Sequence, residues 1–198
     1  MEVVKTLACT GGIGSGKTYI AKIFAKLGYP VYYSDNRAKE LYYTDKLLLS
    51  QMVDLLGSEI LADGKLSTAA VAQKIFSDKN LLEKVEQIVH PALLRDFNNW
   101  KQQQKGCKFV IFESAIILEK PLFRDSADKV LNVVAPLPLR ISMVIKRDNL
   151  TKEQVCQRLS KQWSDEQRAA YADFTIFADS TRAVLPQILD VIEKMNLI

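Results

Sequence analysis

The sequence predicts an α/β fold in which five parallel strands form a sheet with flanking helices. Short apolar runs alternate with helical patterns along the 198 residues, as parallel strands joined by crossover helices require. Two of these runs, Phe109–Phe112 and Val130–Ala135, are apolar at nearly every position, which is typical of strands covered on both faces. A glycine-rich stretch, Gly11–Gly16, lies between the first apolar run and the first helical pattern, as in α/β proteins that bind phosphates.

Composition excludes several classes of protein. With 48% hydrophobic and 25% charged residues, the chain has the average make-up of a soluble globular protein, so a disordered chain and a disulfide scaffold are excluded. The three scattered cysteines, Cys9, Cys107 and Cys156, are expected to be free thiols in a reducing compartment. His90 is the single histidine, which leaves a zinc site without a plausible set of ligands.

Charge and hydropathy narrow the expected location and partners. The net charge of +4 suits ligands rich in phosphate but is too small to indicate nucleic-acid binding. No apolar run approaches the roughly 20 residues that a membrane span needs, and Met1–Lys5 has no signal-peptide pattern. We expect a cytoplasmic protein that binds small molecules and neither nucleic acid nor membrane.

The core elements follow one another in a regular order. Each strand is a short run rich in β-branched or aromatic residues, and each helix shows apolar residues three or four positions apart. The predicted strands are Lys5–Cys9, Pro30–Tyr33, Phe109–Phe112, Val130–Ala135 and Phe174–Phe177. The predicted core helices are Lys17–Leu27, one beginning near Asp35, and Arg182–Met195.

Two helical stretches interrupt this order. In residues 45–104, Ser67 has the position of an N-cap for a helix over Thr68–Phe76, and a longer helix begins near Asn80. Residues 137–172 contain the capping boxes Thr151-x-x-Gln154 and Ser164-x-x-Gln167. We therefore predict a single domain over residues 1–198. Its predicted parts are a core (about 1–44, 105–136 and 173–198), a helical acceptor-binding insertion (about 45–104) and a helical lid (about 137–172).

Residues Gly11–Thr18 match G-x-x-x-x-G-K-[ST] in full, between a predicted strand and a predicted helix. Glycines let the backbone approach phosphates, and the helix amino terminus adds its positive dipole end. Lys17 is placed to reach the β- and γ-phosphates, and the Thr18 hydroxyl to hold Mg²⁺. The sequence therefore predicts a P-loop nucleoside triphosphate hydrolase-type fold with a nucleotide site. The predicted binding residues are Gly12, Ile13, Gly14, Ser15, Gly16, Lys17, Thr18 and Tyr19.

This motif leaves two classes open, a kinase or a GTPase-type switch. A guanine-specific switch is expected to carry N-K-x-D late in the chain, and no such tetrapeptide occurs. Asp54-x-x-Gly57 resembles the D-x-x-G of switches, but it lies in a helical region and not after a buried strand. The kinase interpretation is favoured, because the helical insertion suits an acceptor lobe and the basic helical pair suits a closing lid.

Two acidic residues follow predicted strands. Asp35 lies at the carboxyl edge of the sheet, where ligands of α/β proteins bind, and there it could accept the proton of an acceptor hydroxyl. Position alone fits a helix N-cap equally well. Glu113 ends the third strand, where a carboxylate can orient water bound to Mg²⁺; the alternative is a carboxylate that merely faces solvent.

Basic residues and the histidine are less specific. Some of the lid cations are expected to clamp the transferred charge in a closed state, although spacing does not select among them. They are Arg140, Lys146, Arg147, Arg158, Lys161 and Arg168. His90-Pro91 lies in the long insertion helix, where the proline fits a kink or a helix start, and a lone histidine is more often structural than catalytic.

The whole pattern resembles the dephospho-CoA kinase family. The order and spacing of its motifs hold from residue 6 to about residue 180. They are Thr10–Lys17, Ser34-Asp35, His90-Pro91, Glu113–Glu119, Lys146-Arg147-Asp148 and Arg158-Leu159-Ser160-Lys161-Gln162. The chain departs from the family pattern at Tyr33, where a first aspartate is common, and at Met143, where an arginine is common and Arg140 is the expected substitute.

The resemblance implies an enzyme, an ATP-dependent transferase that phosphorylates the ribose 3′-hydroxyl of dephospho-CoA with the help of Mg²⁺, the last step of coenzyme A synthesis. A nucleoside or nucleoside monophosphate kinase is the alternative. The resemblance implies catalytic roles for Lys17, Asp35 and Arg147, and a metal contact at Thr18. It implies acceptor contacts at Asp35, His90, Glu113 and Arg140. We expect a monomer or a weak homo-oligomer.

Overall fold

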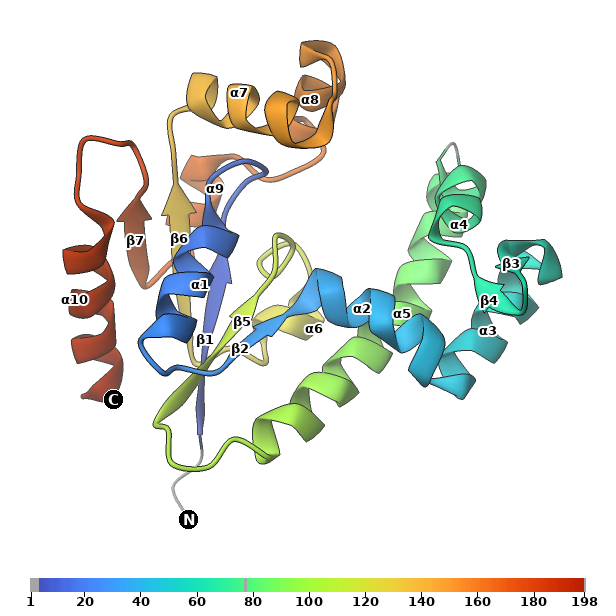
Figure 1. Cartoon of the computed structure of the whole chain (residues 1–198), viewed down its shortest axis with the longest axis horizontal. Helices are drawn as coiled ribbons and strands as arrows, with labels where there is room; N and C mark the ends of the chain where they lie inside the picture. The colour runs from blue at the N-terminus through green and yellow to red at the C-terminus, as the bar shows by residue number, and fades with distance from the viewer. Residues whose placement is uncertain (1–3, 77, 198) are drawn as a thin grey trace. The chain divides into compact units, whose positions relative to one another are not determined.

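The computed structural model describes residues 4–76 and 78–197, and the chain divides into two compact units. The sheet unit comprises residues 1–32 and 101–198, and the helical unit comprises residues 33–100 (Figure 1). The helical unit overlaps most of the stretch predicted as an insertion but begins earlier, at Tyr33. The finer division into core, insertion and lid stays a prediction.

The central sheet has five strands in the order β2-β5-β1-β6-β7 within the described residues. The strands are β1 (Lys5–Thr10), β2 (Val31–Tyr33), β5 (Phe109–Glu113), β6 (Lys129–Val134) and β7 (Phe174–Phe177). Strand β1 pairs in parallel with β5 on one side and with β6 on the other, and β6 pairs in parallel with β7. The predicted five-stranded parallel sheet is therefore confirmed.

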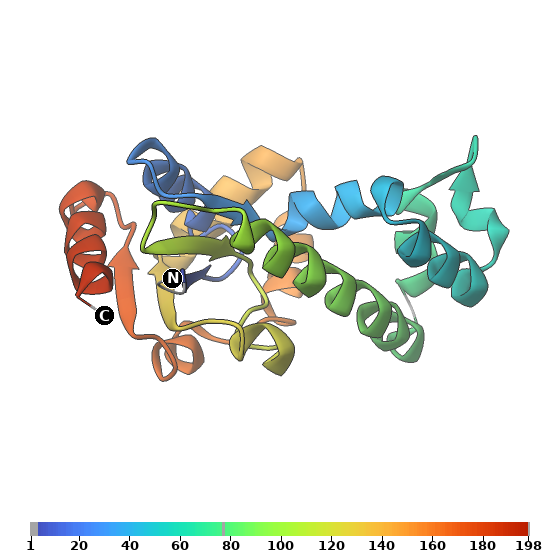
Figure 2. The ribbon, with the colours of Figure 1, turned by 90° about the horizontal axis from the view of Figure 1, so that it is seen from below.

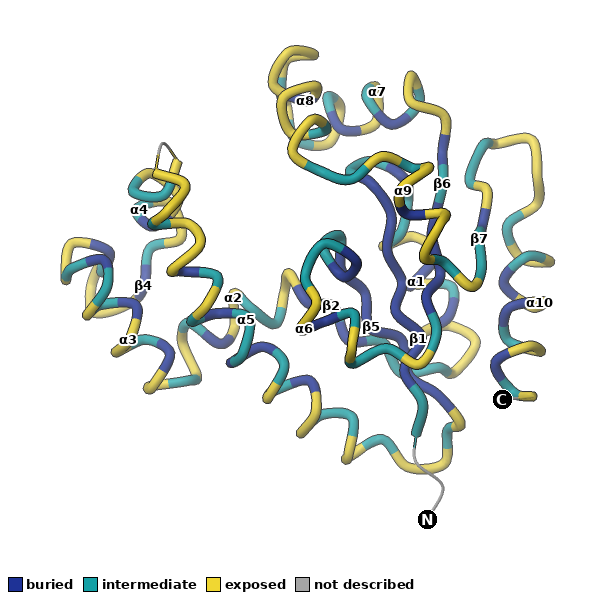
Figure 3. Tube along the Cα trace, turned by 180° about the vertical axis from the view of Figure 1, so that it is seen from behind, coloured by how far each residue is buried: buried dark blue, intermediate teal, exposed yellow. Residues whose placement is uncertain are grey.

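Helices cover both faces of this sheet. On one face, Phe24 of α1 (Lys17–Lys26) and Ile188 of α10 (Val184–Asn196) belong to the same buried cluster as Leu7 and Cys9 of β1. Figure 2 shows α1 on one side of the sheet and α6 (Pro121–Arg124) and α9 (Asp165–Ala169) on the other. The strands between them are buried along most of their length, as the dark blue of Figure 3 shows. The continuous apolar runs of the sequence follow from this double coverage.

The predicted lid region forms α7 (Leu137–Asp148), α8 (Lys152–Leu159) and α9. Both predicted capping boxes are present, because each N-cap hydroxyl and each N3 glutamine side chain accepts a backbone hydrogen bond. In Figure 1, α7 and α8 lie beyond the carboxyl ends of β1 and β6, next to the loop that leads into α1. The capping boxes thus fix short helices beside the predicted nucleotide site.

The helical unit holds α2 (Ser34–Thr44), α3 (Lys46–Leu56), a 3₁₀ turn (Ser58–Ile60), a small hairpin of β3 (Leu61–Ala62) and β4 (Lys65–Leu66), α4 (Thr68–Ile75) and most of α5 (Lys79–Gln102). Ser67 caps α4 as predicted, since its hydroxyl accepts from the Ala70 N–H at 3.3 Å. Pro91 lies inside α5. The helix begins twelve residues before the proline, at Lys79, so the alternative of a helix start at Pro91 is wrong.

No helix in the ranges 4–76 and 78–197 is long and apolar enough to span a membrane.

Candidate active site

The loop between β1 and α1 has the backbone that an anion site needs. Gly16 is the N-cap residue of α1, with φ of 92°, and it gives the first helical turn no side-chain cap. The N–H groups of that turn therefore keep their donor capacity at the positive end of the helix dipole. Inside the loop, the Ser15 hydroxyl oxygen is buried and has no hydrogen-bond partner within the described part of the chain. An unpartnered buried oxygen in a glycine loop fits a loop built to enclose a ligand.

Thr18 and Glu113 meet at the start of α1. The Thr18 Oγ1 donates to Glu113 Oε1 at 3.0 Å, and Glu113 is 3% exposed. Strand β5 lies beside β1 in register, which places Glu113 opposite Cys9, at the carboxyl end where the loop begins. The alternative of a solvent-facing Glu113 is therefore wrong. A hydroxyl and a carboxylate are hard oxygen donors, so this pair fits Mg²⁺.

The Ile13 peptide of the loop is held on both sides by the lid region. Its N–H donates to Gln162 Oε1 at 2.8 Å, and its carbonyl oxygen accepts from Arg140 Nε at 3.0 Å. Arg140 is 5% exposed, and its Nη1 donates to both carboxylate oxygens of Asp165, at 3.1 and 2.9 Å. Arg140 therefore packs against the glycine loop at Ile13, and its Nε and Nη1 both donate hydrogen bonds within the protein.

Two loop glycines are needed for this packing. A Cβ at Gly12 would overlap the Arg140 guanidinium. A Cβ at Gly14 would lie 2.6 Å from the Arg140 carbonyl oxygen and 2.8 Å from Val144 Cγ2, and Gly14 has φ of 77°. Both glycines therefore make room for α7, a reason beyond the phosphate approach that the motif suggests.

Arg147 lies at the other end of α7 and is exposed. Its Nε and Nη2 donate to the Asp148 carboxylate at 2.7 and 3.0 Å, and Arg158 of α8 lies 3.6 Å from the same carboxylate. These hydrogen bonds hold the pKa of Asp148 below its ordinary value. The late basic residues therefore separate into two that are buried, Arg140 at the loop and Arg168 in α9, and four that are exposed. Two of the exposed four, Arg147 and Arg158, lie around Asp148.

Two of the predicted site residues, Asp35 and His90, lie in the helical unit. Asp35 is exposed in the first turn of α2, whose N-cap residue is Tyr33, so its interpretation as the helix N-cap is wrong. It lines a cavity of about 360 Å³ between α2 and α4, together with Tyr42, Val71 and Ile75. Burial raises the pKa of the Tyr42 phenol. His90 is half-buried in α5.

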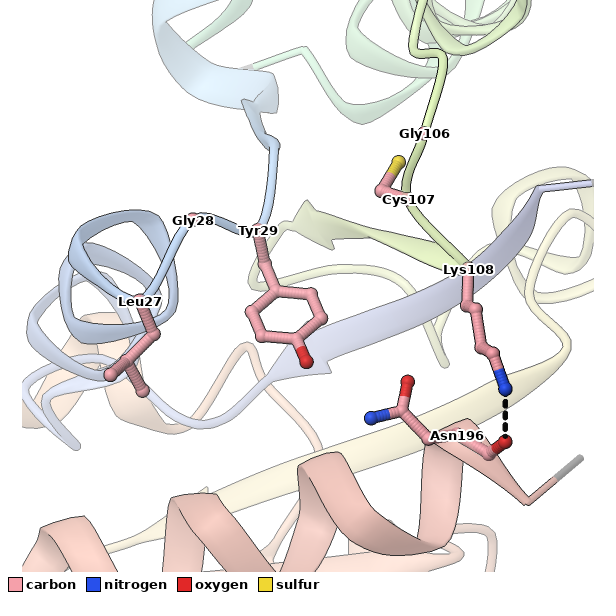
Figure 4. Close-up of a pocket in the computed structure, with 7 residues that line it drawn as sticks. All are labelled: Leu27, Gly28, Tyr29, Gly106, Cys107, Lys108 and Asn196. Atoms are coloured by element: carbon pink, nitrogen blue, oxygen red, sulfur yellow. Dashed lines mark hydrogen bonds between the residues drawn. The ribbon is translucent and has the colours of Figure 1, made fainter.

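A second cavity, of about 370 Å³, lies in the sheet unit before the start of β5 (Figure 4). It is lined by Tyr29 and Cys107, and Lys108 spans it to donate to the carbonyl oxygen of Asn196 at 2.9 Å. Tyr29 precedes β2 and Cys107 precedes β5, whereas the glycine loop follows β1. The cavity therefore lies at the opposite end of the parallel strands. It contains none of the predicted site residues.

Comparison with known proteins shows which family has this combination of glycine loop, parallel sheet and flanking helices. The family model for dephospho-CoA kinase matches residues 5–183. The chain belongs to the dephospho-CoA kinase family.

Three further similarities extend over nearly the whole chain. The dephospho-CoA kinase of Bacteroides fragilis is 36% identical over 186 residues, which cover 94% of this chain and 90% of that relative. A crystal structure from Thermus thermophilus aligns with a TM-score of 0.81 at 25% identity and covers 98% of this chain and 97% of that chain. Dephospho-CoA kinase from Campylobacter jejuni shares the fold, with a TM-score of 0.61, 21% identity and 98% coverage of both chains.

Some side-chain contacts of this dephospho-CoA kinase family member were not predicted from its sequence. Gln162 was part of the R-L-x-x-Q motif, but its contact with Ile13 had no local signal, because the two residues are 149 positions apart. The ion pairs of Asp165 and Glu119 with Arg140 and Arg168 were likewise not predicted. Helical spacing can show which residues share a face, but it cannot show which loop that face meets.

Proposed function

We propose that this chain transfers the γ-phosphoryl group of ATP to the ribose 3′-hydroxyl of dephospho-CoA, giving coenzyme A and ADP. Membership of the dephospho-CoA kinase family supports this acceptor. The contact of Thr18 with the buried Glu113 at the foot of a complete P-loop is the single structural observation that carries the donor half of the proposal.

On the donor side, the N–H groups of the loop and of the first turn of α1 bind the β- and γ-phosphates. Lys17, which is half-buried at the start of α1, offers its ammonium to the same oxygens. Thr18 and Glu113 would hold Mg²⁺, which when bound adds positive charge next to the phosphates. This arrangement stabilises the charge that develops as the γ-phosphoryl group moves.

On the acceptor side, Asp35 accepts the proton of the 3′-hydroxyl as the phosphoryl group arrives. Two features support this role: Asp35 follows β2 by two residues, and its carboxylate is exposed and not used as a helix cap. His90 contacts the acceptor, and Arg147 closes over the transferred group, exchanging Asp148 for phosphate oxygens. Such clamps are pre-formed donors for a spreading negative charge.

The acceptor is tested by measuring ADP release from MgATP with dephospho-CoA, AMP, other nucleoside monophosphates, adenosine and water. ADP release that depends on dephospho-CoA, with a product carrying a new 3′-phosphate, is the expected result. Turnover with a monophosphate alone would replace the proposal with the nucleoside monophosphate kinase alternative. ATP binding without turnover on any acceptor would reject the kinase activity altogether.

The base is tested by Asp35→Asn, with Asp54→Asn on an exposed face of α3 as the matched control. We expect Asp35→Asn to lower kcat by at least ~10² while ATP binding stays within about twofold, because a general base contributes on that scale. The control should keep the kcat of the unmodified chain. A kcat for Asp35→Asn within threefold of that value would remove Asp35 from the reaction.

A further inference from the structure

We infer that Arg140 and Gln162 are positioning residues that act on the nucleotide through the Ile13 peptide, and that Arg140 does not bind substrate directly. This inference rests on the proposed function only in that the loop binds a nucleoside triphosphate. It replaces the acceptor contact that the family resemblance implies for Arg140.

The first observation is that one loop residue is held at both of its backbone polar groups. Gln162 accepts from the Ile13 N–H at 2.8 Å, and Arg140 Nε donates to the Ile13 carbonyl oxygen at 3.0 Å. Two hydrogen bonds on one residue fix both its position and the direction of its peptide planes. Since Ile13 immediately precedes Gly14, the same bonds determine where the following N–H groups point.

The second observation is that these bonds leave other donors for the phosphates. The Ile13 N–H is taken by Gln162, and the Ser15 N–H donates to the Gly12 carbonyl oxygen at 3.0 Å. We therefore assign the phosphates to the N–H groups of Gly14 and Gly16 and of the first turn of α1. The role of Ile13 is then structural, through its backbone N–H and carbonyl groups.

The third observation is that Arg140 is itself anchored by a row of alternating charges. Arg140 donates to Asp165, Asp165 lies 3.6 Å from Arg168, and Arg168 donates from Nη2 to Glu119 at 3.0 Å. Arg168 is fully buried, and its Nη1 also donates to the Trp163 carbonyl oxygen at 2.6 Å. The row joins the glycine loop to α9 and to the segment after β5. Arg140 therefore cannot turn toward a ligand without giving up its two hydrogen bonds to Asp165.

A buried guanidinium is costly to place, and buried ion pairs add little net stability. Their use here is orientational, because a planar guanidinium has fixed donor directions that an ammonium lacks. A loop already held in its binding conformation loses less entropy when ATP arrives. Arg140 and Gln162 thus raise the affinity for ATP without touching it.

The experiment compares Gln162→Met, which keeps the side-chain length and removes the acceptor oxygen, with Gln157→Met on the exposed face of α8. ATP binding is measured by calorimetry without acceptor, so the result does not depend on the reaction proposed above. We expect Gln162→Met to raise the Kd for ATP about two- to tenfold, the effect of one hydrogen bond, and Gln157→Met to leave it unchanged. The Tm of Gln162→Met should stay within about 4 °C of the unmodified chain.

Arg140→Lys keeps the positive charge but cannot reach the Ile13 carbonyl oxygen and Asp165 together. We expect a rise in the Kd for ATP of at least about tenfold, since a charged hydrogen bond is lost, with the KM for the acceptor unchanged. The double variant should lose less ATP affinity than the product of the two single effects, because both hydrogen bonds act on the backbone of Ile13. If lysine preserves ATP affinity, Arg140 does not position the nucleotide; if the acceptor KM rises instead, Arg140 is a direct ligand of the acceptor. Either result means that the inference is wrong.

A readout at Ile13 itself separates positioning from general stability. Amide hydrogen exchange at Ile13 should become at least about tenfold faster in Gln162→Met, while Ala21, buried in the middle of α1, keeps its protection. A lower Tm with an unchanged Kd for ATP would show a merely structural role. Tighter ATP binding in Gln162→Met would show that Gln162 competes with phosphate for the Ile13 N–H. Either result overturns the inference.

Discussion

The carboxylate of Glu113 is the most informative single group in the sheet unit. It ends a fully buried strand, is almost inaccessible to water, and still accepts a hydrogen bond from the hydroxyl of Thr18. Burying a carboxylate is expensive unless it is paired or binds a cation. Packing does not require a charge at this end of β5. A role in binding the nucleotide, through its Mg²⁺, explains the position of Glu113 best.

Glu113→Gln therefore should lower kcat by at least ~10² and shift the activating Mg²⁺ concentration upward, since a neutral amide is a weaker ligand and a weaker electrostatic partner. Steady-state rates across a Mg²⁺ titration check this. Glu193→Gln, on the exposed side of α10, is the matched control and should behave as the unmodified chain does. An unchanged Mg²⁺ profile for Glu113→Gln would leave the buried charge without a functional explanation.

The three thiols differ in reactivity for reasons of burial. Cys156 is exposed, Cys107 is half-buried, and Cys9 is buried within β1. Burial raises the pKa of Cys107, so less of the reactive thiolate forms at a given pH. Iodoacetamide at pH 8, followed by mass spectrometry of the peptides, should modify Cys156 first, Cys107 more slowly and Cys9 only on unfolding. Modification of Cys9 as fast as Cys156 would contradict the burial of β1.

At the scale of elements, the glycine loop can pack closely against α7 because Gly12 and Gly14 have no side chains. Gly14→Ala and Gly28→Ala both place a Cβ on a residue with positive φ, 77° and 91°. In both variants the free energy of unfolding should fall by about 1–2 kcal/mol for this reason. Only the Cβ at position 14 meets α7, whereas the one at position 28 has nothing within 4 Å. We expect both variants to lose stability in urea unfolding but only Gly14→Ala to lose ATP affinity. Equal ATP affinity in the two variants would mean that α7 moves to accommodate the added Cβ without disturbing the loop.

Most elements of the sheet unit could be predicted from the sequence because their signals are local. The strand Phe174–Phe177 is confirmed without change, and β1 extends only one residue beyond its predicted end. The small β3–β4 hairpin was not predicted, although Asp63-Gly64, with φ of 50° and 73°, is a turn pair typical of tight hairpins. Strands of two residues are too short for alternation to be visible, which explains the omission.

The candidate site could be predicted in its backbone but not in its side-chain network. The P-loop and its following lysine and threonine form one continuous motif, so the nucleotide half was visible. Arg140 was assigned to the substrate from the family resemblance, as the substitute for an arginine at the position of Met143. In the fold its guanidinium lies against the Ile13 carbonyl oxygen, 127 positions away. Which side chains meet across such separations depends on packing that no spacing rule contains.

For the molecule as a whole, Cys9 should make the free energy of unfolding decrease at alkaline pH. Burial, together with the negative Glu113, raises the pKa of Cys9 well above its ordinary value of 9.0. Above pH 9 the unfolded chain therefore releases this proton while the folded chain keeps it, so stability falls as pH rises, by up to about 1.4 kcal/mol per pH unit. Urea unfolding at pH 8, 9 and 10 should show this slope, and Cys9→Ala should reduce it. Parallel curves for the two proteins would contradict the buried, protonated thiol.

The strand order also has a consequence for how the protein is made. β1 is the centre of the sheet, yet its first partner, β5, lies 104 positions later, since Lys5 pairs with Phe109. At ribosomal speeds of about 5–20 residues per second, the apolar β1 waits roughly 5–20 s before β5 is synthesised. During that interval residues 33–100, whose contacts are largely internal, can complete their own unit. The nucleotide loop leaves the ribosome long before it acquires its shape, because Arg140 and Gln162 are translated later still.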